Sequence, residues 1–124
     1  MRTLLVVIAL AFSTSVAAAP TVTQLAADRV AAAAKAYTSI VARLDVVQPE
    51  DIYRWSVRWL DAQLDDPATG KAIPQAFANH AKRMTELEAQ VQAGYQKGLK
   101  PAFDLAAVNY YKLEAELWVA RGKK

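Results

Sequence analysis

Residues 77–121 read FANHAKRMTELEAQVQAGYQKGLKPAFDLAAVNYYKLEAELWVAR, and this stretch decides the fold. Apolar side chains recur at steps of three and four residues in both halves, which keeps them on one face of a helix. In the first half they are Phe77, His80, Met84, Leu87, Val91 and Tyr95. In the second half they are Phe103, Ala106, Tyr110, Leu113, Leu117 and Ala120, widened by Leu105, Val108 and Trp118. We therefore expect two long helices, each with one stripe facing the core.

The break between the two patterns has the residues of a tight helix–helix turn. Gly98 can take the left-handed conformation that closes a helix, and Leu99 is placed to fold back on its last turn. Pro101 suits the first turn of the next helix, where its missing N–H costs nothing. Asp104 then lies near the positive end of the helix dipole. Helices joined by so short a connection must run antiparallel.

Two further helices are predicted upstream. Thr21 and Gln24 fit a capping box, and the stripe that follows is Ala26, Val30, Ala33, Tyr37, Ile40 and Leu44. The next helix begins at Pro49 and is apolar around most of its circumference, so it needs more than one neighbour. It is either the most buried helix, or its tryptophans meet a second molecule. Residues 51–64 resemble residues 104–117, which indicates two related hairpins unless the amphipathic patterns agree by chance.

The N-terminus has the order of a secretory signal peptide. Met1-Arg2 is positive, residues 4–12 are apolar, and small residues suited to cleavage after Ala17, Ala18 or Ala19 follow. The apolar run is shorter than the roughly 20 residues that span a bilayer; an uncleaved anchor is the alternative. We therefore predict a signal peptide over residues 1–19 and a single helical domain over residues 20–124. The mature protein is expected to be secreted or periplasmic, without a transmembrane segment.

Composition points to an all-α fold: antiparallel hairpins forming a small four-helix bundle. The chain has no cysteine and only four glycines, so packing rather than disulfides must hold it together. Its formal charge of +3 demands no nucleic-acid or anionic-membrane partner.

No pattern in the chain specifies a cofactor, a metal or a catalytic residue. His80 is the only histidine, and it shares a helix face with Met84, so the two cannot bind a haem iron from opposite sides. Zinc sites need three or four ligands that one histidine and no cysteine do not supply. We predict His80 to be a core or boundary residue, and we expect the protein not to be an enzyme.

Two residue sets remain as candidates for binding. Aromatic surface beside arginines is typical of protein interfaces, and the candidates for partner binding are Trp55, Trp59, Tyr111 and Trp118. The alternative for them is core packing. Three arginines are candidates for binding an anionic metabolite, with a solvated charged face as the alternative; they are Arg54, Arg58 and Arg83.

The second hairpin also resembles a known family. Tyr95-x-x-Gly98, then Asp104-Leu105, then the LEAEL run of residues 113–117 resemble the repeated hairpin of TolC-like outer-membrane efflux proteins. The similarity covers residues 84–121 and, more faintly, residues 37–64. The segment YYKLEAELW, residues 110–118, is also similar to the end of small exported bacterial proteins. The resemblance implies a helical hairpin in the cell envelope that packs against other long helices, without channel activity, because strands for a membrane barrel are absent.

These observations predict a small exported helical bundle that serves as a protein-interaction or structural module. Its partner would be another envelope protein or a second copy of the chain. The alternative is a small-molecule binder or small helical enzyme that uses the three arginines.

Overall fold

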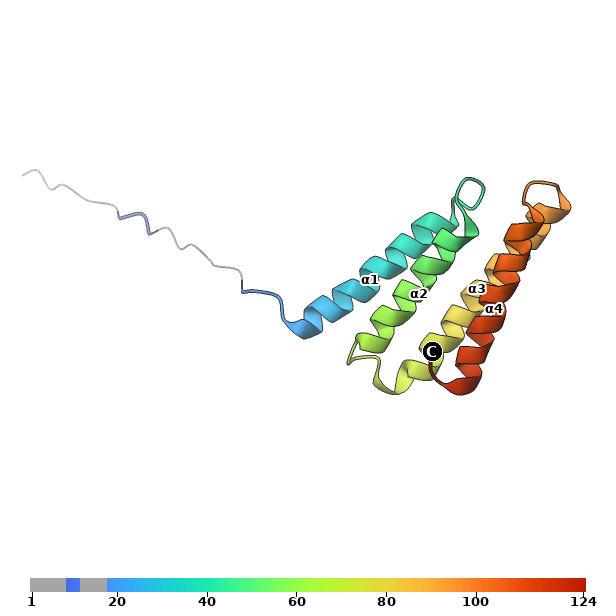
Figure 1. Cartoon of the computed structure of the whole chain (residues 1–124). Coiled ribbons are helices and arrows are strands. Elements are labelled where there is room, and N and C mark those ends of the chain that lie inside the picture. The colour runs from blue at the N-terminus through green and yellow to red at the C-terminus, as the bar shows by residue number, and fades with distance from the viewer. Residues whose placement is uncertain (1–8, 12–17) are drawn as a thin grey trace, which may run out of the picture.

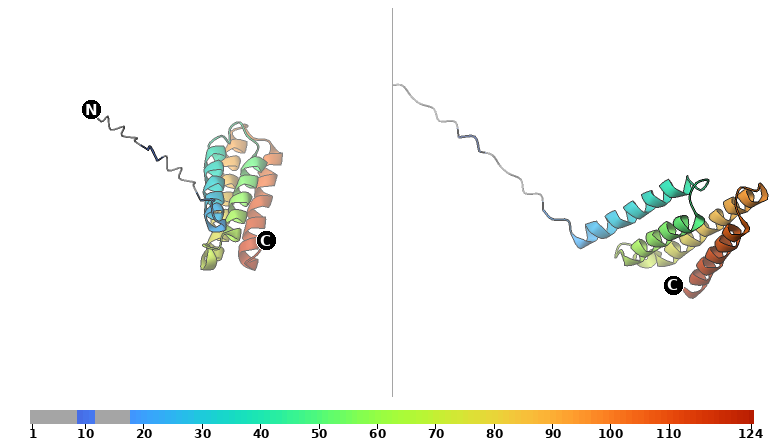
Figure 2. Two further views of the ribbon diagram at one scale, coloured as in Figure 1. Left: turned by 90° about the vertical axis from the view of Figure 1, so that its left-hand side faces the viewer. Right: turned by 45° about the horizontal axis from the view of Figure 1, so that its top comes forward.

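The computed structural model describes residues 9–11 and 18–124, and this part of the chain is helical without a strand. Its α-helices are α1 (Val22–Val41), α2 (Pro49–Asp65), α3 (Ile73–Gln96) and α4 (Ala102–Arg121), and a 3-10 turn, η1 (Gly70–Ala72), precedes α3. Helices α1 and α2 form one hairpin, and α3 and α4 form another beside it (Figure 1). The four helices run alongside one another (Figure 2). The predicted all-α bundle of hairpins is confirmed.

Most of the predicted signal peptide, residues 1–8 and 12–17, lies outside the described residues. No helix in the described part of the chain has the length and apolar character needed to cross a membrane.

Two predicted helix ends form, the capping box at the start of α1 and the glycine closure at the end of α3. The Gln24 backbone N–H donates to Thr21 Oγ1 (3.2 Å) and the Thr21 N–H donates to Gln24 Oε1 (2.9 Å), which completes the capping box. Gly98 has a φ of 73°, and its N–H donates to the carbonyl of Tyr95 at 3.0 Å. The Leu99 N–H reaches the carbonyl of Gly94 at 2.8 Å, so α3 ends in a Schellman motif. The Leu99 side chain does not fold back, since it is 73% exposed.

Helix α2 is the central element of the bundle. It contacts α1, α3 and α4, whereas the backbone of α1 lies close to α2 only and α1 reaches α3 through the side chain of Tyr37. The main core cluster contains Tyr37, Ile52, Met84, Leu87, Val91, Val108 and Ala115. A smaller one contains Leu60, Ala76 and Phe77. The sequence allowed two roles for the second helix, the most buried helix of the bundle or a helix whose tryptophans meet a second molecule. The central position of α2 supports the first.

The main stripe predicted to face the core on α4 is exposed, whereas Leu105, Val108 and Trp118, which were predicted to widen it, lie on the buried side. Phe103 is 78% exposed, and Tyr110, Leu113 and Leu117 are 61%, 55% and 45% exposed. The face turned inward carries Val108 and Ala115, both fully buried, together with Asp104, Leu105, Tyr111 and Trp118. Both faces of α4 are apolar. The inward face carries small side chains, which let α3 approach, and aromatic rings, which reach α2. Packing against α2 and α3 therefore decided between two apolar faces of α4 that helical periodicity does not distinguish.

Candidate functional site

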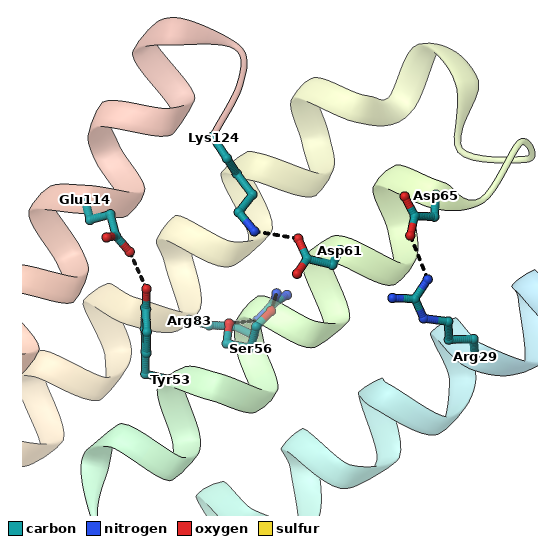
Figure 3. A network of polar contacts seen from close by, with 8 residues as sticks. All are labelled: Arg29, Tyr53, Ser56, Asp61, Asp65, Arg83, Glu114 and Lys124. Carbon is teal, nitrogen blue, oxygen red and sulfur yellow. Dashed lines mark hydrogen bonds and ion pairs between the residues drawn. The ribbon is translucent and has the colours of Figure 1, made fainter.

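Helix α2 makes a polar side-chain contact with each of the other three helices (Figure 3). Arg29 of α1 lies 2.7 Å from Asp65, and Tyr53 donates to Glu114 of α4 at 2.5 Å. Lys124, just beyond α4, lies 2.7 Å from Asp61. The Arg29–Asp65 pair is more than half exposed, so it contributes little to stability. The contact to α3 is different, because it is buried.

That buried contact joins Ser56 on α2 to His80 and Arg83 on α3. Ser56 Oγ lies 2.7 Å from His80 Nδ1, and Arg83 Nε donates to the same oxygen at 2.7 Å. Arg83 Nη2 also donates to the Ser56 carbonyl at 3.1 Å. Because the arginine occupies the hydroxyl oxygen as a donor, the hydroxyl hydrogen is free to point at His80 Nδ1. In this arrangement a neutral His80 with its hydrogen on Nε2 accepts from Ser56, and its buried Nε2 has no hydrogen-bond partner in the described part of the chain.

The environment fixes the charge of both basic groups. Burial lowers the pKa of His80 to about 3, with smaller contributions from the charges of Arg83 and Lys124. Burial also lowers the pKa of Arg83 to about 10, which leaves the guanidinium charged at neutral pH. No carboxylate forms an ion pair with Arg83 in the described part of the chain. Its charge instead faces the rings of Trp59, at 4.2 Å, and Tyr37, at 5.4 Å.

A serine beside a histidine is also the geometry of an activated nucleophile. Here Ser56 and His80 are both fully buried, so a substrate cannot reach the hydroxyl in this arrangement. Arg83 donates to Ser56 Oγ and withdraws electron density from it, which opposes nucleophilic attack. The geometry therefore supports a structural role, in which the cluster fixes the register of α2 against α3.

The four aromatic candidates are half-buried, and each contacts another side chain of the same chain. Trp59 packs on Tyr37 and Arg83, and Tyr111 stacks on Tyr53 with ring centroids 4.1 Å apart. Trp118 stacks on His80 at 5.5 Å, and Trp55 lies under the guanidinium of Arg58 at 4.5 Å. Most of their surface is therefore used inside the fold, as the core-packing alternative predicts.

The three arginine candidates do not form one clamp. Arg54 is exposed and pairs with Glu50 at 3.0 Å, one turn earlier on α2. Arg83 is only 7% exposed and lines a hollow between α1, α2 and α3. Arg58 lines a different hollow, between α1 and α2, beside Trp55 and Arg29. A ligand held by all three would have to contact both hollows.

Metal ligands are not gathered anywhere in the described residues, where no group of three His, Cys, Asp or Glu side chains is placed to hold an ion.

Sequence reasoning did not find the Ser56–His80–Arg83 cluster. Two signals point to it in retrospect. Ser56 lies four residues from both Ile52 and Leu60, which places a hydroxyl in the middle of a core-facing stripe. His80 and Arg83 are three residues apart, so they share a helix face. The pairing across two helices depends on their register, which sequence does not provide.

The outer face of α4 is the other unusual feature. A shallow hollow runs along it, lined by Tyr110, Leu113, Glu114, Leu117, Trp118 and Arg121. Its tyrosine, tryptophan and arginine are the residue types that most often dominate protein interfaces, and the two leucines add apolar surface beside them. Among the four aromatic candidates, Trp118 alone borders this surface. The candidate interface is therefore the outer face of α4, and Arg121 rather than the predicted arginines accompanies it.

Comparison of the chain with protein-family models, curated proteins and solved structures gives no match.

Proposed function

We propose that the protein is an exported, non-catalytic helical module that binds a protein partner through the outer face of α4. The observation that carries this proposal is the row of exposed apolar side chains on that helix, Phe103, Tyr110, Leu113 and Leu117. Contiguous apolar surface of this kind marks interaction sites on soluble proteins.

The setting of the proposal comes from the sequence. The N-terminal residues have the order of a signal peptide, so the partner is expected in the cell envelope or outside the cell. The non-catalytic role is supported by the burial of Ser56 and His80, which keeps a substrate from reaching this serine–histidine pair.

Site-specific photo-cross-linking in the native host tests this function. Benzoylphenylalanine is placed at Phe103 or at Leu113, with Gln90 on the exposed polar face of α3 as the matched control position. We expect covalent protein adducts from both α4 positions and none from the control. Absence of adducts from α4, or equal adducts from Gln90, would contradict the proposal.

A second candidate function is the binding of a small anionic molecule between α1 and α2. Arg29 and Arg58 line the same hollow there, beside the ring of Trp55. Arg29 is already paired with Asp65, so Arg58 would provide most of the free charge. Thermal-shift measurements with anionic metabolites test it. Stabilisation that persists unchanged in the Arg58→Ala variant would exclude this site.

A further inference from the structure

Helix α4 carries the apolar surface of a central helix but occupies an edge of the bundle. Val108 and Ala115 on one face are fully buried against the rest of the molecule. The opposite face leaves Phe103, Tyr110 and Leu113 more than half exposed. Helix α2 is also apolar on more than one face, and it has α1 on one side and α3 and α4 on the other. A helix with two apolar faces is expected to have two neighbours, and among the described residues α4 has helical neighbours on one side only, α3 and α2.

The exposed face has the periodicity of a coiled-coil seam. Its apolar positions alternate steps of three and four residues without interruption over the whole helix: Phe103, Ala106, Tyr110, Leu113, Leu117 and Ala120. We call this set the outer stripe. A repeat of 3.5 residues keeps such a stripe against another helix over its full length. The outer stripe therefore fits a long helix better than it fits a strand, a loop or a small ligand.

We propose that the outer stripe is covered by the outer stripe of a second copy of this chain, with the two α4 helices antiparallel. This inference rests on the proposed function and names its partner. The reason is the order of large and small residues. In an antiparallel pair centred on the middle of the stripe, Phe103 faces Ala120 of the second copy and Ala106 faces its Leu117. Tyr110 faces Leu113, and two-fold symmetry repeats each of these contacts.

Every layer of that pair joins a larger side chain to a smaller one, which is how well-packed seams interdigitate. A parallel pair would instead place Phe103 on Phe103 and Ala106 on Ala106. Its Phe103 and Tyr110 layers would be crowded, and its Ala106 and Ala120 layers would be underfilled. The stripe therefore complements itself better in the antiparallel direction than in the parallel one, and a second copy of the chain supplies a partner with this order of large and small residues.

Charge and area are consistent with the same arrangement. In this register Glu114 would lie opposite Asn109 of the second copy and Glu116 opposite its Ala107, so acids do not meet near the centre. The antiparallel helix dipoles also attract each other. The four large side chains expose on the order of 450 Å² of surface per chain. A pair would bury about 900 Å² from these side chains alone, close to the lower bound of about 1,000 Å² for a specific interface before the alanines and rim are included.

Cysteine cross-linking tests the direction, because the chain has no cysteine of its own. Phe103→Cys and Ala120→Cys are made as separate variants, one of them tagged, and oxidised alone and as an equal mixture. We expect the mixture to form the mixed disulfide and each single variant to form little. Strong homodimer formation by Phe103→Cys alone would indicate a parallel pair and overturn the proposal. Failure of the mixture to cross-link would also overturn it.

Solution mass tests the interface with a matched pair of substitutions. Leu113→Lys places a charge in the outer stripe, whereas Val119→Lys makes a similar change at a position of α4 that is 43% exposed and outside the stripe. We expect light scattering to give a dimer for the unmodified protein and for Val119→Lys, and at least tenfold weaker association for Leu113→Lys. Circular dichroism confirms that both variants are helical.

The antiparallel dimer and the proposed protein-binding function can be refuted independently of each other. An unmodified protein that is monomeric up to about 100 µM, but yields heterologous adducts from α4 in cells, would refute the second copy and retain the interaction function. A monomer without any adduct from α4 would refute both.

Discussion

Lowering the pH from 7 to 4 is expected to remove about 3 kcal/mol from the free energy of unfolding through His80 alone. In the folded protein its pKa is lowered to about 3 by burial and by the charges of Arg83 and Lys124. In the unfolded chain the imidazole has its ordinary pKa of 6.5. Between these two values the unfolded state binds a proton that the folded state does not. The stability is therefore fully present above pH 6.5 and is lost as the pH falls toward 3.

The size of this loss of stability follows from the difference between the pKa values of His80 in the folded and unfolded states. One pKa unit corresponds to about 1.4 kcal/mol, so the full difference approaches 5 kcal/mol. Domains of this size are stable by about 5–15 kcal/mol, which makes the loss a large fraction of the total. Protonation of His80 would also replace the hydrogen-bond acceptor at Nδ1 with a donor facing Ser56. The lost hydrogen bond to Ser56 and the stronger proton binding of the unfolded state therefore both destabilise the folded protein at low pH.

His80→Asn isolates this contribution from the titration of carboxylates. The Asn oxygen lies close to the position of Nδ1, so it can accept from the Ser56 hydroxyl, and it does not titrate. The assay is urea unfolding followed by tryptophan fluorescence at pH 7, 6, 5 and 4. We expect the unmodified protein to lose about 3 kcal/mol more than the variant over this range. Since the chain has no other histidine, parallel pH profiles for the two proteins would refute the reasoning.

Three further predictions concern two contacts between helices and the turn that joins α3 to α4. Ser56→Ala removes the acceptor of Arg83 and the donor to His80 in a buried site, and urea unfolding should show a loss of about 2–3 kcal/mol. Tyr53→Phe removes the hydrogen bond to Glu114, whose carboxylate can regain water at the half-buried site; we expect a loss of about 1–2 kcal/mol and a melting temperature lower by several degrees in calorimetry. Gly98→Ala forces a side chain into a positive φ of 73°, and thermal unfolding should report a loss of about 1–2 kcal/mol with the helix content unchanged.

Much of the fold was predictable because its signals are local. The Thr21 capping box, the left-handed Gly98 and the stripe of α3 depend on residues within one or two turns of each other. The stripe of α3 is buried from Phe77 to Val91, and its last member, Tyr95, is 43% exposed at the end of the helix. His80 is buried as predicted. These features follow from backbone geometry and helical periodicity, which act before any helix meets another.

The candidate site was less predictable because its members meet across helices. Sequence identified Trp55, Trp59 and Trp118 as unusual, and gave both partner binding and core packing as explanations. Their half-buried positions and internal contacts favour packing, which depends on which helix is central. The buried Arg83 depends in the same way on the rings of Trp59 and Tyr37, which come from two other helices.

The sequence by itself determined that this chain forms helices, that the first begins after Thr21 and the third closes at Gly98, and that a short turn makes the last two antiparallel. The end of α1 was not determined in this way, because the predicted stripe runs to Leu44 and the helix ends at Val41. Tertiary structure alone decided which side of α4 became the core. Its two apolar faces have comparable hydrophobicity, so helical periodicity does not distinguish them. Val108 and Ala115 permit close contact with α3, while Tyr111 and Trp118 reach Tyr53 and His80 on neighbouring helices. Shape complementarity across helices made that choice, and it left the outer stripe at the surface.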